Sequence, residues 1–441
     1  MRKNLQHLTV PVKNELESSA TLTTNQTLLK EVTYTKKDIE GFNYLHSSSG
    51  KPPYLRGTST LMYTQKPLPI AYSIFITTKQ EGNTLLKKAI KNNLSIFYLD
   101  HKTLNTVNNV SLEKASPDKL IFNTLNDIEV LFKDIDITKN TFYIPCNNAI
   151  LATIALFLVY AEQHNLKLEK LKIVFTNNSS KNWSNEQNAS IMLDVFNYLS
   201  KKAPNIKLLN ICDINQKKEI TAPTQIANAI TAGLINVNSA IKNGINIDQF
   251  ASSLVFNYNP GLNIFLEIAK TRATRMLWVK CLNAYKPKNQ NSSKLQLQTK
   301  INSNNKLETA NNIAKHTVKA SIANLAGIDC IINNTENKAT LIVQEETGIN
   351  KTIDALGGSY YIESLTNQLA NKAWLLICKH NTTQQTYKNN TKKNELEKTK
   401  QDLVLLTGTT NLNKSTNFLE LAINAVKNGT TAHTINLILR P

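Results

Sequence analysis

The stretch TFYIPCNNAILATIALFLVYAEQHNLKLEKLKIVFTN, residues 141–177, decides the interpretation of the fold. It holds a short β-branched and aromatic run at 141–146, an apolar helical run at 149–165 and a second short run at 172–177. This order predicts a strand, a helix and a strand. The most apolar part, 149–161, is too short to span a bilayer and is followed by Glu162 and Gln163, so we expect a buried helix.

The same alternation of strand and helix continues on both sides of this stretch. Eight βα units within roughly 300 residues favour a closed (β/α)8 TIM barrel of the α/β class over an open sheet. No G-x-G-x-x-G motif lies between a strand and a helix, which weakens a dinucleotide-binding alternative. The predicted strands are 69–76, 94–100, 141–146, 172–177, 206–213, 253–258, 295–300 and 327–334.

The composition excludes several classes of protein. The net charge of +19 comes from Lys residues spread along the 441 residues, and only 386–400 is dense in charge. That segment interleaves acids and has no aromatic residue except Tyr387, so it predicts a solvated connector rather than a nucleic-acid site. The five cysteines include no C-x-x-C, and the N-terminus has no apolar signal region. We therefore expect a cytoplasmic protein without disulfides, zinc or a membrane segment.

In a (β/α)8 barrel the chemistry belongs at the C-terminal ends of the strands. Amides dominate these positions here, and only Asp100 and His101 resemble an acid–base pair. Adjacent residues on a strand point to opposite faces, so a surface histidine is the expectation. We expect Cys146 to be a buried structural cysteine and Asp213 to cap a turn, although a nucleophile and a base remain alternatives.

Four stretches together resemble the barrel chain of the methylmalonyl-CoA mutases. They are DIEGFNYLHSSSGKPPYLRGTSTLMYT (38–64), NPGLNIFLEIAKTRATRMLW (259–278), QEETGINK (344–351) and DALGGSYYIESLTNQLANKAW (354–374). The resemblance covers 38–380. It implies a (β/α)8 barrel that threads a CoA ester along its axis, with adenosylcobalamin supplied by a separate flavodoxin-like domain that carries a D-x-H-x-x-G motif.

The resemblance also implies a role for the paired glycines Gly357 and Gly358. They would form a turn after the eighth strand, before a closing helix at 366–380, instead of holding a phosphate. Ser364 or Thr366 would cap that helix.

The sequence departs from the family at the positions that carry the chemistry. Where the family has an Arg and a Tyr on the first strand, which flank the substrate, this sequence has Ala71 and Ser73. Where it has a Tyr-His pair after the fifth strand, the sequence has Ile214 and Asn215. Thr176 replaces a Gln that holds the substrate carboxylate, and no Arg follows it. We predict no catalytic residue in this chain.

Two positions keep part of the family pattern. Gln298 is retained on the seventh strand, and Lys66 replaces an Arg of the CoA-contacting segment, which preserves the charge without the bidentate fork. These two residues are candidates for weak substrate binding. None of the seven histidines lies in a D-x-H-x-x-G motif, so no cofactor-binding or metal-ligating residue and no cobalamin-binding domain are expected.

The retained scaffold and the lost site predict the small, non-catalytic subunit of a two-chain bacterial methylmalonyl-CoA mutase. Its partner would be a large catalytic chain that holds adenosylcobalamin, in a heterodimer. The predicted organisation is an N-terminal arm (1–50), the barrel (51–380), and a connector with a short C-terminal tail (381–441). Two alternatives stay open: a catalytic acyl-CoA mutase barrel that works with a separate cobalamin-binding chain, and a stand-alone binder of acyl-CoA or nucleic acid.

Overall fold

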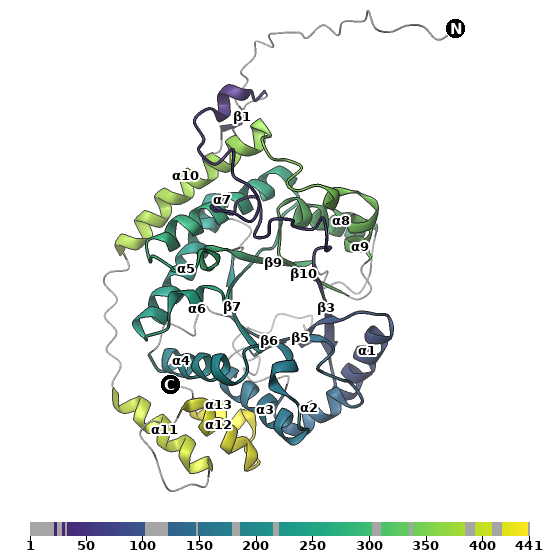
Figure 1. The fold of residues 1–441 in the computed structure, drawn as a ribbon, viewed down its shortest axis with the longest axis vertical. Coiled ribbons are helices and arrows are strands. Elements are labelled where there is room, and N and C mark those ends of the chain that lie inside the picture. Colours follow the sequence, from purple (N-terminus) through teal and green to yellow (C-terminus); the bar gives the residue numbers. More distant parts are fainter. Residues whose placement is uncertain are drawn as a thin grey trace, which may run out of the picture.

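Eight parallel strands close into one barrel in the computed structural model, in the order β10-β3-β4-β5-β6-β7-β8-β9 (Figure 1). The structure describes residues 22–23, 29–30, 33–101, 122–146, 149–178, 186–214, 220–301, 310–334, 338–383, 393–407 and 417–439. Each predicted strand overlaps an observed one, so the (β/α)8 barrel is confirmed. The strands are β3 (Ile70–Ile76), β4 (Ile96–His101), β5 (Thr141–Pro145), β6 (Lys172–Asn178), β7 (Lys207–Asp213), β8 (Leu254–Asn257), β9 (Gln296–Ile301) and β10 (Cys330–Asn334).

Helices follow the strands and form the outer layer of the barrel (Figure 1). A short antiparallel pair, β1 (Leu22–Thr23) and β2 (Leu29–Lys30), and the 3-10 helix η1 (Lys36–Ile39) precede the barrel. The main outer helices are α1 (Lys79–Lys91), α2 (Leu125–Phe132), α3 (Ile150–Gln163), α4 (Glu186–Lys202), α5 (Ala222–Lys242), α7 (Ile264–Asn283), α8 (Ala310–Leu325) and α10 (Tyr360–Thr383). Shorter elements between them are η2 (Leu168–Lys170), α6 (Ile247–Ala251), η3 (Gln290–Ser293), α9 (Ala339–Glu346) and η4 (Ile349–Lys351).

Helix α3 is buried on all sides along most of its length, as its sequence predicts. Every residue from Ile150 to Ala161 is buried. Its inner side packs on the barrel, and its outer side is covered by α12 (Phe418–Lys427) and α13 (Ala432–Ile438), which lie beside it in Figure 1. An apolar helix of this length stays out of water only because these later helices cover it.

The C-terminal segment contains more structure than the sequence indicates. Instead of a plain tail, it forms α11 (Lys393–Thr407), α12 and α13. The backbone N–H of Phe418 donates to the Asp194 carboxylate over 2.8 Å, and the backbone N–H of Ala432 donates to the Asn123 carbonyl over 2.8 Å. An exposed ion pair joins Lys427 to Glu162 at 2.7 Å. These contacts tie the segment to α4, to the chain before α2 and to α3.

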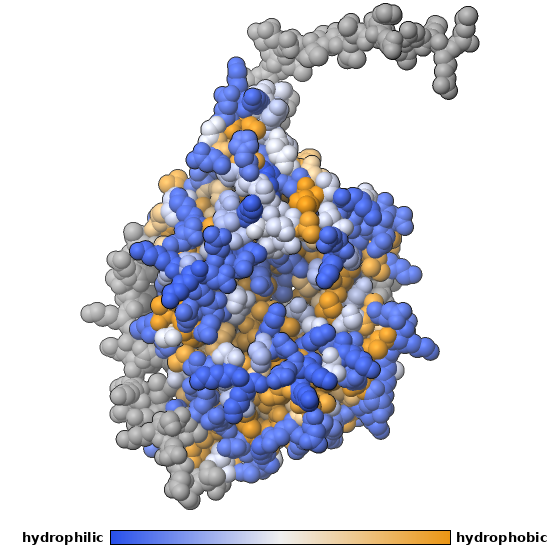
Figure 2. All heavy atoms as spheres, viewed as in Figure 1, coloured by the Kyte–Doolittle hydropathy of each residue, from blue (hydrophilic) through white to orange (hydrophobic). Residues whose placement is uncertain are grey.

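The visible face of the protein is mostly hydrophilic (Figure 2). Figure 2 shows hydrophilic residues over all parts of the visible face, with smaller hydrophobic areas between them. Of the helices that the structure describes, none combines the length and the apolar character that crossing a bilayer requires.

The packing of α12 on α3 generates a stability prediction. Leu419 is fully buried, so we expect Leu419→Ala to lower the free energy of unfolding by about 3 kcal/mol through lost burial and a residual cavity. Leu437 on α13 is 48% exposed, and Leu437→Ala is the matched control, with a change below about 0.5 kcal/mol. Urea unfolding of the full chain measures both. Equal effects of the two substitutions would show that the tail helices do not cover the barrel.

Candidate functional site

The axis of the barrel is lined by alternate residues of each strand. Val174, Leu209 and Val255 form a small apolar cluster with Tyr143, separate from the large core between the strands and the helices. Residues paired across neighbouring strands share a face of the sheet, and Tyr143 pairs with Val174. Strand residues that pair with members of this cluster, or that lie two positions from a member on the same strand, therefore face the axis.

An ion pair crosses the axis near the C-terminal ends of the strands. Lys300 on β9 pairs with Asp100 on β4, and the Lys300 ammonium lies 5.5 Å from the centre of the Tyr98 ring. Strands β9 and β4 are separated by β10 and β3 in the closed sheet, so side chains can join them only through the interior. The Lys300–Asp100 pair therefore occupies the axis.

A second set of side chains crosses the middle of the barrel. The rings of Tyr98 and Tyr143 stack with their centres 6.4 Å apart. The Tyr143 side chain lies close to the Cys330 sulfur on β10, which is separated from β5 by two strands. We call Asp100, Lys300, Tyr98, Tyr143 and Cys330 the axial contacts.

The axial contacts are not suited to acid–base chemistry near neutral pH. Burial raises the pKa of the Cys330 thiol to about 12, and burial and the neighbouring Cys330 raise the pKa of Tyr143 above its usual range. Both groups therefore stay protonated and fill the barrel as neutral polar side chains. Asp100 pairs with Lys300, while the side chain of His101, its suggested partner, lies outside the described residues.

Four residues singled out by the sequence come together around the axis. Ala71, Ser73, Thr176 and Gln298 are all buried. The Ser73 hydroxyl has no hydrogen-bond partner among the described residues. In the register of the sheet, Ala71 pairs with Ile332, Ser73 with Tyr98, Thr176 with Leu209 and Gln298 with Cys330.

The remaining predicted positions lie elsewhere. Ile214 is buried in the large core after β7, and its backbone N–H donates to the Asn257 carbonyl over 2.9 Å. Lys66 is exposed in the segment before β3, whereas Gln298 is buried on β9. Asn215 and the side chain of Asp213 lie outside the described residues. Cys146 is buried as expected, and burial raises the pKa of its thiol well above the usual range.

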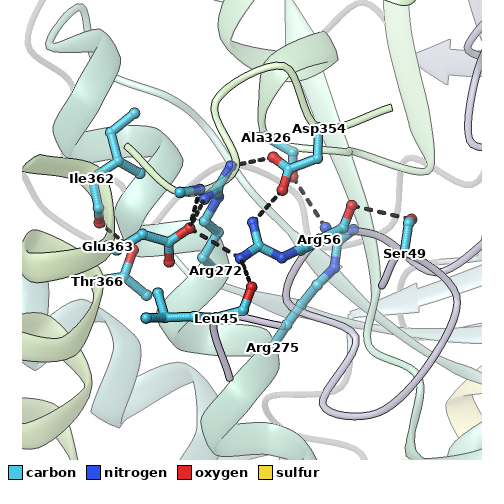
Figure 3. A network of polar contacts seen from close by, with 11 residues as sticks. Leu45, Ser49, Arg56, Arg272, Arg275, Ala326, Asp354, Ile362, Glu363 and Thr366 are labelled. Carbon is cyan, nitrogen blue, oxygen red and sulfur yellow. Dashed lines mark hydrogen bonds and ion pairs between the residues drawn. The ribbon is translucent and has the colours of Figure 1, made fainter. Parts of the chain in front are cut away.

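A buried network of charges, which the sequence analysis did not identify, holds the N-terminal arm to the barrel (Figure 3). Asp354 pairs with both Arg56 and Arg272. One oxygen of Glu363 accepts from Arg56 at 3.1 Å and from Arg272 at 3.2 Å. All four side chains are at least nine-tenths buried. Two cations and two anions balance each other, which reduces the cost of burying them.

We call Arg56, Arg272, Asp354 and Glu363 the charge clamp. It joins the segment between the arm and β3, helix α7, and the chain from Asp354 into α10, three segments far apart in the sequence. The arm is further fixed because the Tyr44 hydroxyl donates to the Glu363 carbonyl over 3.1 Å. The clamp residues fall in three of the four stretches that carry the family resemblance. The sequence thus pointed to the stretches that hold the clamp residues, but it did not show which of these residues form ion pairs.

The paired glycines lie against the charge clamp. A Cβ atom on Gly357 would lie 2.7 Å from Asp354 Oδ2 and 2.8 Å from Arg56 Nη1. Gly358 has a φ of +78°, and its N–H donates to Glu363 Oε1 over 3.0 Å. The prediction that the glycines form a turn after the eighth strand and before the closing helix agrees with this geometry.

The predicted helix cap after the glycines is wrong. Helix α10 begins at Tyr360, so Ser364 and Thr366 lie inside it. The Thr366 hydroxyl donates back to the Ile362 carbonyl over 2.7 Å, as interior helical threonines often do.

Among the residues that the structure describes, no group of three or more His, Cys, Asp or Glu side chains is arranged to hold a metal ion.

Comparison with known proteins identifies the scaffold. The family model described as Methylmalonyl-CoA mutase matches residues 23–383. The methylmalonyl-CoA mutase large subunit of Porphyromonas gingivalis is 29% identical over 386 residues, covering 80% of this chain and 54% of the relative. The methylmalonyl-CoA mutase of Rhizobium meliloti is 28% identical, covering 78% and 53%, and that of Escherichia coli is 26% identical, covering 78% and 52%. The chain spans about half the length of these curated relatives.

The charge clamp predicts a large effect from a small change. We expect Asp354→Asn to lower the free energy of unfolding by about 3 kcal/mol, because it leaves two buried guanidinium groups with one carboxylate. Asp134→Asn is the control: Asp134 pairs with Lys87 on the surface, where such a pair contributes little to stability. Thermal or urea unfolding measures the difference. Similar losses in the two variants would contradict the clamp.

The cysteines offer a test of the site chemistry. Because the thiolate is the reactive form, iodoacetamide at pH 8 should modify the exposed Cys378 and leave Cys146 unmodified in the folded chain. Mass spectrometry after proteolysis measures the modification at each position, and unfolding in urea should remove the protection. If Cys146 in the folded chain were modified as fast as Cys378, the alternative that Cys146 is a nucleophile would be supported.

Proposed function

We propose that this chain, which belongs to the methylmalonyl-CoA mutase family, is a non-catalytic small subunit that stabilises a large catalytic chain. In this proposal the two chains form a heterodimer that interconverts methylmalonyl-CoA and succinyl-CoA. The large chain carries the reaction, and this chain acts as a folded barrel that binds it. Binding a partner stabilises the bound fold by mass action.

The axial contacts carry the proposal. They occupy the axis along which, in the family that this chain resembles, a CoA ester is expected to run. Lys300 and Asp100 cross it near the strand ends, and the side chains of Tyr143 and Cys330 approach each other across it lower down. A barrel that needs no ligand is stabilised by filling its own interior.

The residues at the family's chemical positions also support the proposal. A substrate carboxylate buried in a barrel needs a cationic partner, and Ala71 and Thr176 are neutral. A thioester carbonyl needs a hydrogen-bond donor, and the Ile214 side chain has none. The unpartnered hydroxyl of Ser73 is a small neutral group at a position where the family resemblance implies a large one.

We assign adenosylcobalamin to the partner chain. When bound, this cofactor supplies the radical that starts the rearrangement. The residues of this chain do not fit it: the described histidines His46, His164, His316 and His433 lie in the arm or on outer helices, and no D-x-H-x-x-G motif occurs in the 441 residues.

A second candidate is a catalytic acyl-CoA mutase barrel that works with a separate cobalamin-binding chain. One observation favours it: several relatives are named as large subunits, among them those of Porphyromonas gingivalis and Streptomyces virginiae. The neutral residues at the chemical positions count against it. Adding a small cobalamin-binding protein and adenosylcobalamin to the purified chain separates the two candidates, because only the second predicts turnover of methylmalonyl-CoA.

Co-expression tests the leading proposal. A tagged form of this chain should retain the large mutase chain through size-exclusion chromatography, and the complex should convert methylmalonyl-CoA. The chain purified alone should show neither turnover nor a corrinoid absorption band. As a control, the Asp134→Asn variant should retain the partner equally well, because the substitution affects only a surface ion pair. A corrinoid band in the chain alone, or no retention of the large chain, would contradict the proposal.

A further inference from the structure

A hollow of about 780 Å³ lies on the outer wall of the barrel, where the neighbouring helices α2 and α3 end (Figure 1). Its wall is formed by α2, by the turn that follows α2 and by the C-terminal end of α3. None of the described residues that line it belongs to a strand, so it is separate from the barrel axis. Its volume is within the range of small-molecule sites in proteins, about 300–1,000 Å³.

One part of the lining is apolar. Phe132 and Ile137 are buried, and Val130, Ile135 and Leu166 are half-buried. A ligand that covers the half-buried side chains removes apolar surface from water, which favours binding. This part of the hollow therefore suits an alkyl chain.

A buried hydroxyl group without a partner also lines the hollow. Tyr160 on α3 is only 7% exposed, and its hydroxyl has no hydrogen-bond partner among the residues that the structure describes. A buried tyrosine hydroxyl usually has one. Burial and the nearby Glu129 carboxylate raise the pKa of Tyr160, so the hydroxyl stays protonated at neutral pH. It is available to bond a polar group of a ligand.

The charge next to this hydroxyl favours a cation. Among the described residues Glu129 forms no ion pair with a lysine or an arginine, and its nearest charged neighbour is His164, with 3.9 Å between Oε1 and Nε2. The two other carboxylates in the lining, Asp134 and Asp136, are paired with surface lysines. The C-terminal ends of α2 and α3 add partial negative charge. The rings of Tyr160 and His164, 4.3 Å apart between their centres, offer faces that attract a cation.

We infer that this hollow binds a small alkylammonium ion, with its ammonium group between the Glu129 carboxylate and the Tyr160 hydroxyl. Its alkyl chain covers Val130, Ile135 and Leu166. An ammonium group has three donors, and the two oxygen groups accept two of them. The inference does not depend on the subunit role, because it rests only on the outer wall of the barrel.

Ligand-observed NMR titration of the full chain at pH 7.5 with hexylammonium, hexanol and hexanoate tests the inference. Hexylammonium should bind saturably at one site, and hexanol about fivefold more weakly, because it lacks the charge. Hexanoate should bind more weakly than hexanol, because Glu129 repels it. Glu129→Gln should weaken hexylammonium about fivefold, and Tyr160→Phe should weaken it by a similar factor through the lost hydrogen bond.

Two further variants make the test specific. Lys133→Gln removes a positive charge from the lining and should strengthen hexylammonium binding about twofold. Glu345→Gln on α9 removes a carboxylate from an exposed position outside the hollow and should leave binding unchanged. A thermal melt shows that each variant is folded. Binding that is absent, that is equal for hexanol, that survives Glu129→Gln, or that Lys133→Gln weakens would overturn the inference.

Discussion

The contact between Lys300 and Asp100 is the constraint on which the functional account depends. In the closed sheet β10 and β3 separate β9 from β4, and this ion pair joins β9 and β4 through the interior. Below it the side chain of Tyr143 approaches Cys330 across the interior, and the Tyr98 ring stacks on Tyr143. The family resemblance implies a CoA ester along the barrel axis. A barrel whose own side chains fill this axis keeps the fold but leaves no room for the ester. That is what the proposed subunit role requires.

Two other features maintain the barrel from outside. The charge clamp fixes the N-terminal arm against α7 and α10, and Gly357 is needed because any side chain there would meet Asp354 and Arg56. On another part of the barrel, α12 and α13 cover the apolar helix α3. Neither feature involves the axis. The barrel can therefore remain stable when the residues at the family's catalytic positions are replaced. This explains how the fold is kept although those residues differ.

The sequence predicted the strands well and the interior contacts poorly. Each strand is a short apolar run between helical segments, a signal that needs no knowledge of the rest of the chain. The meeting of Lys300 with Asp100 depends on the register of several strands, which no local pattern encodes. The tail helices were missed because many Lys and Asn residues surround the apolar face of α12, formed by Phe418, Leu419 and Ala422. The charge clamp was present in the family stretches, but its pairs are brought together only by the fold.

A double-mutant cycle on Lys300 and Asp100 tests the central claim most directly. The free energy of unfolding is measured for the unmodified chain, Lys300→Met, Asp100→Asn and the double variant. Because both side chains are partly exposed within the barrel, the account predicts a coupling of about 1 kcal/mol. Strictly additive effects would mean that the two side chains do not meet and that the axis is not occupied as described.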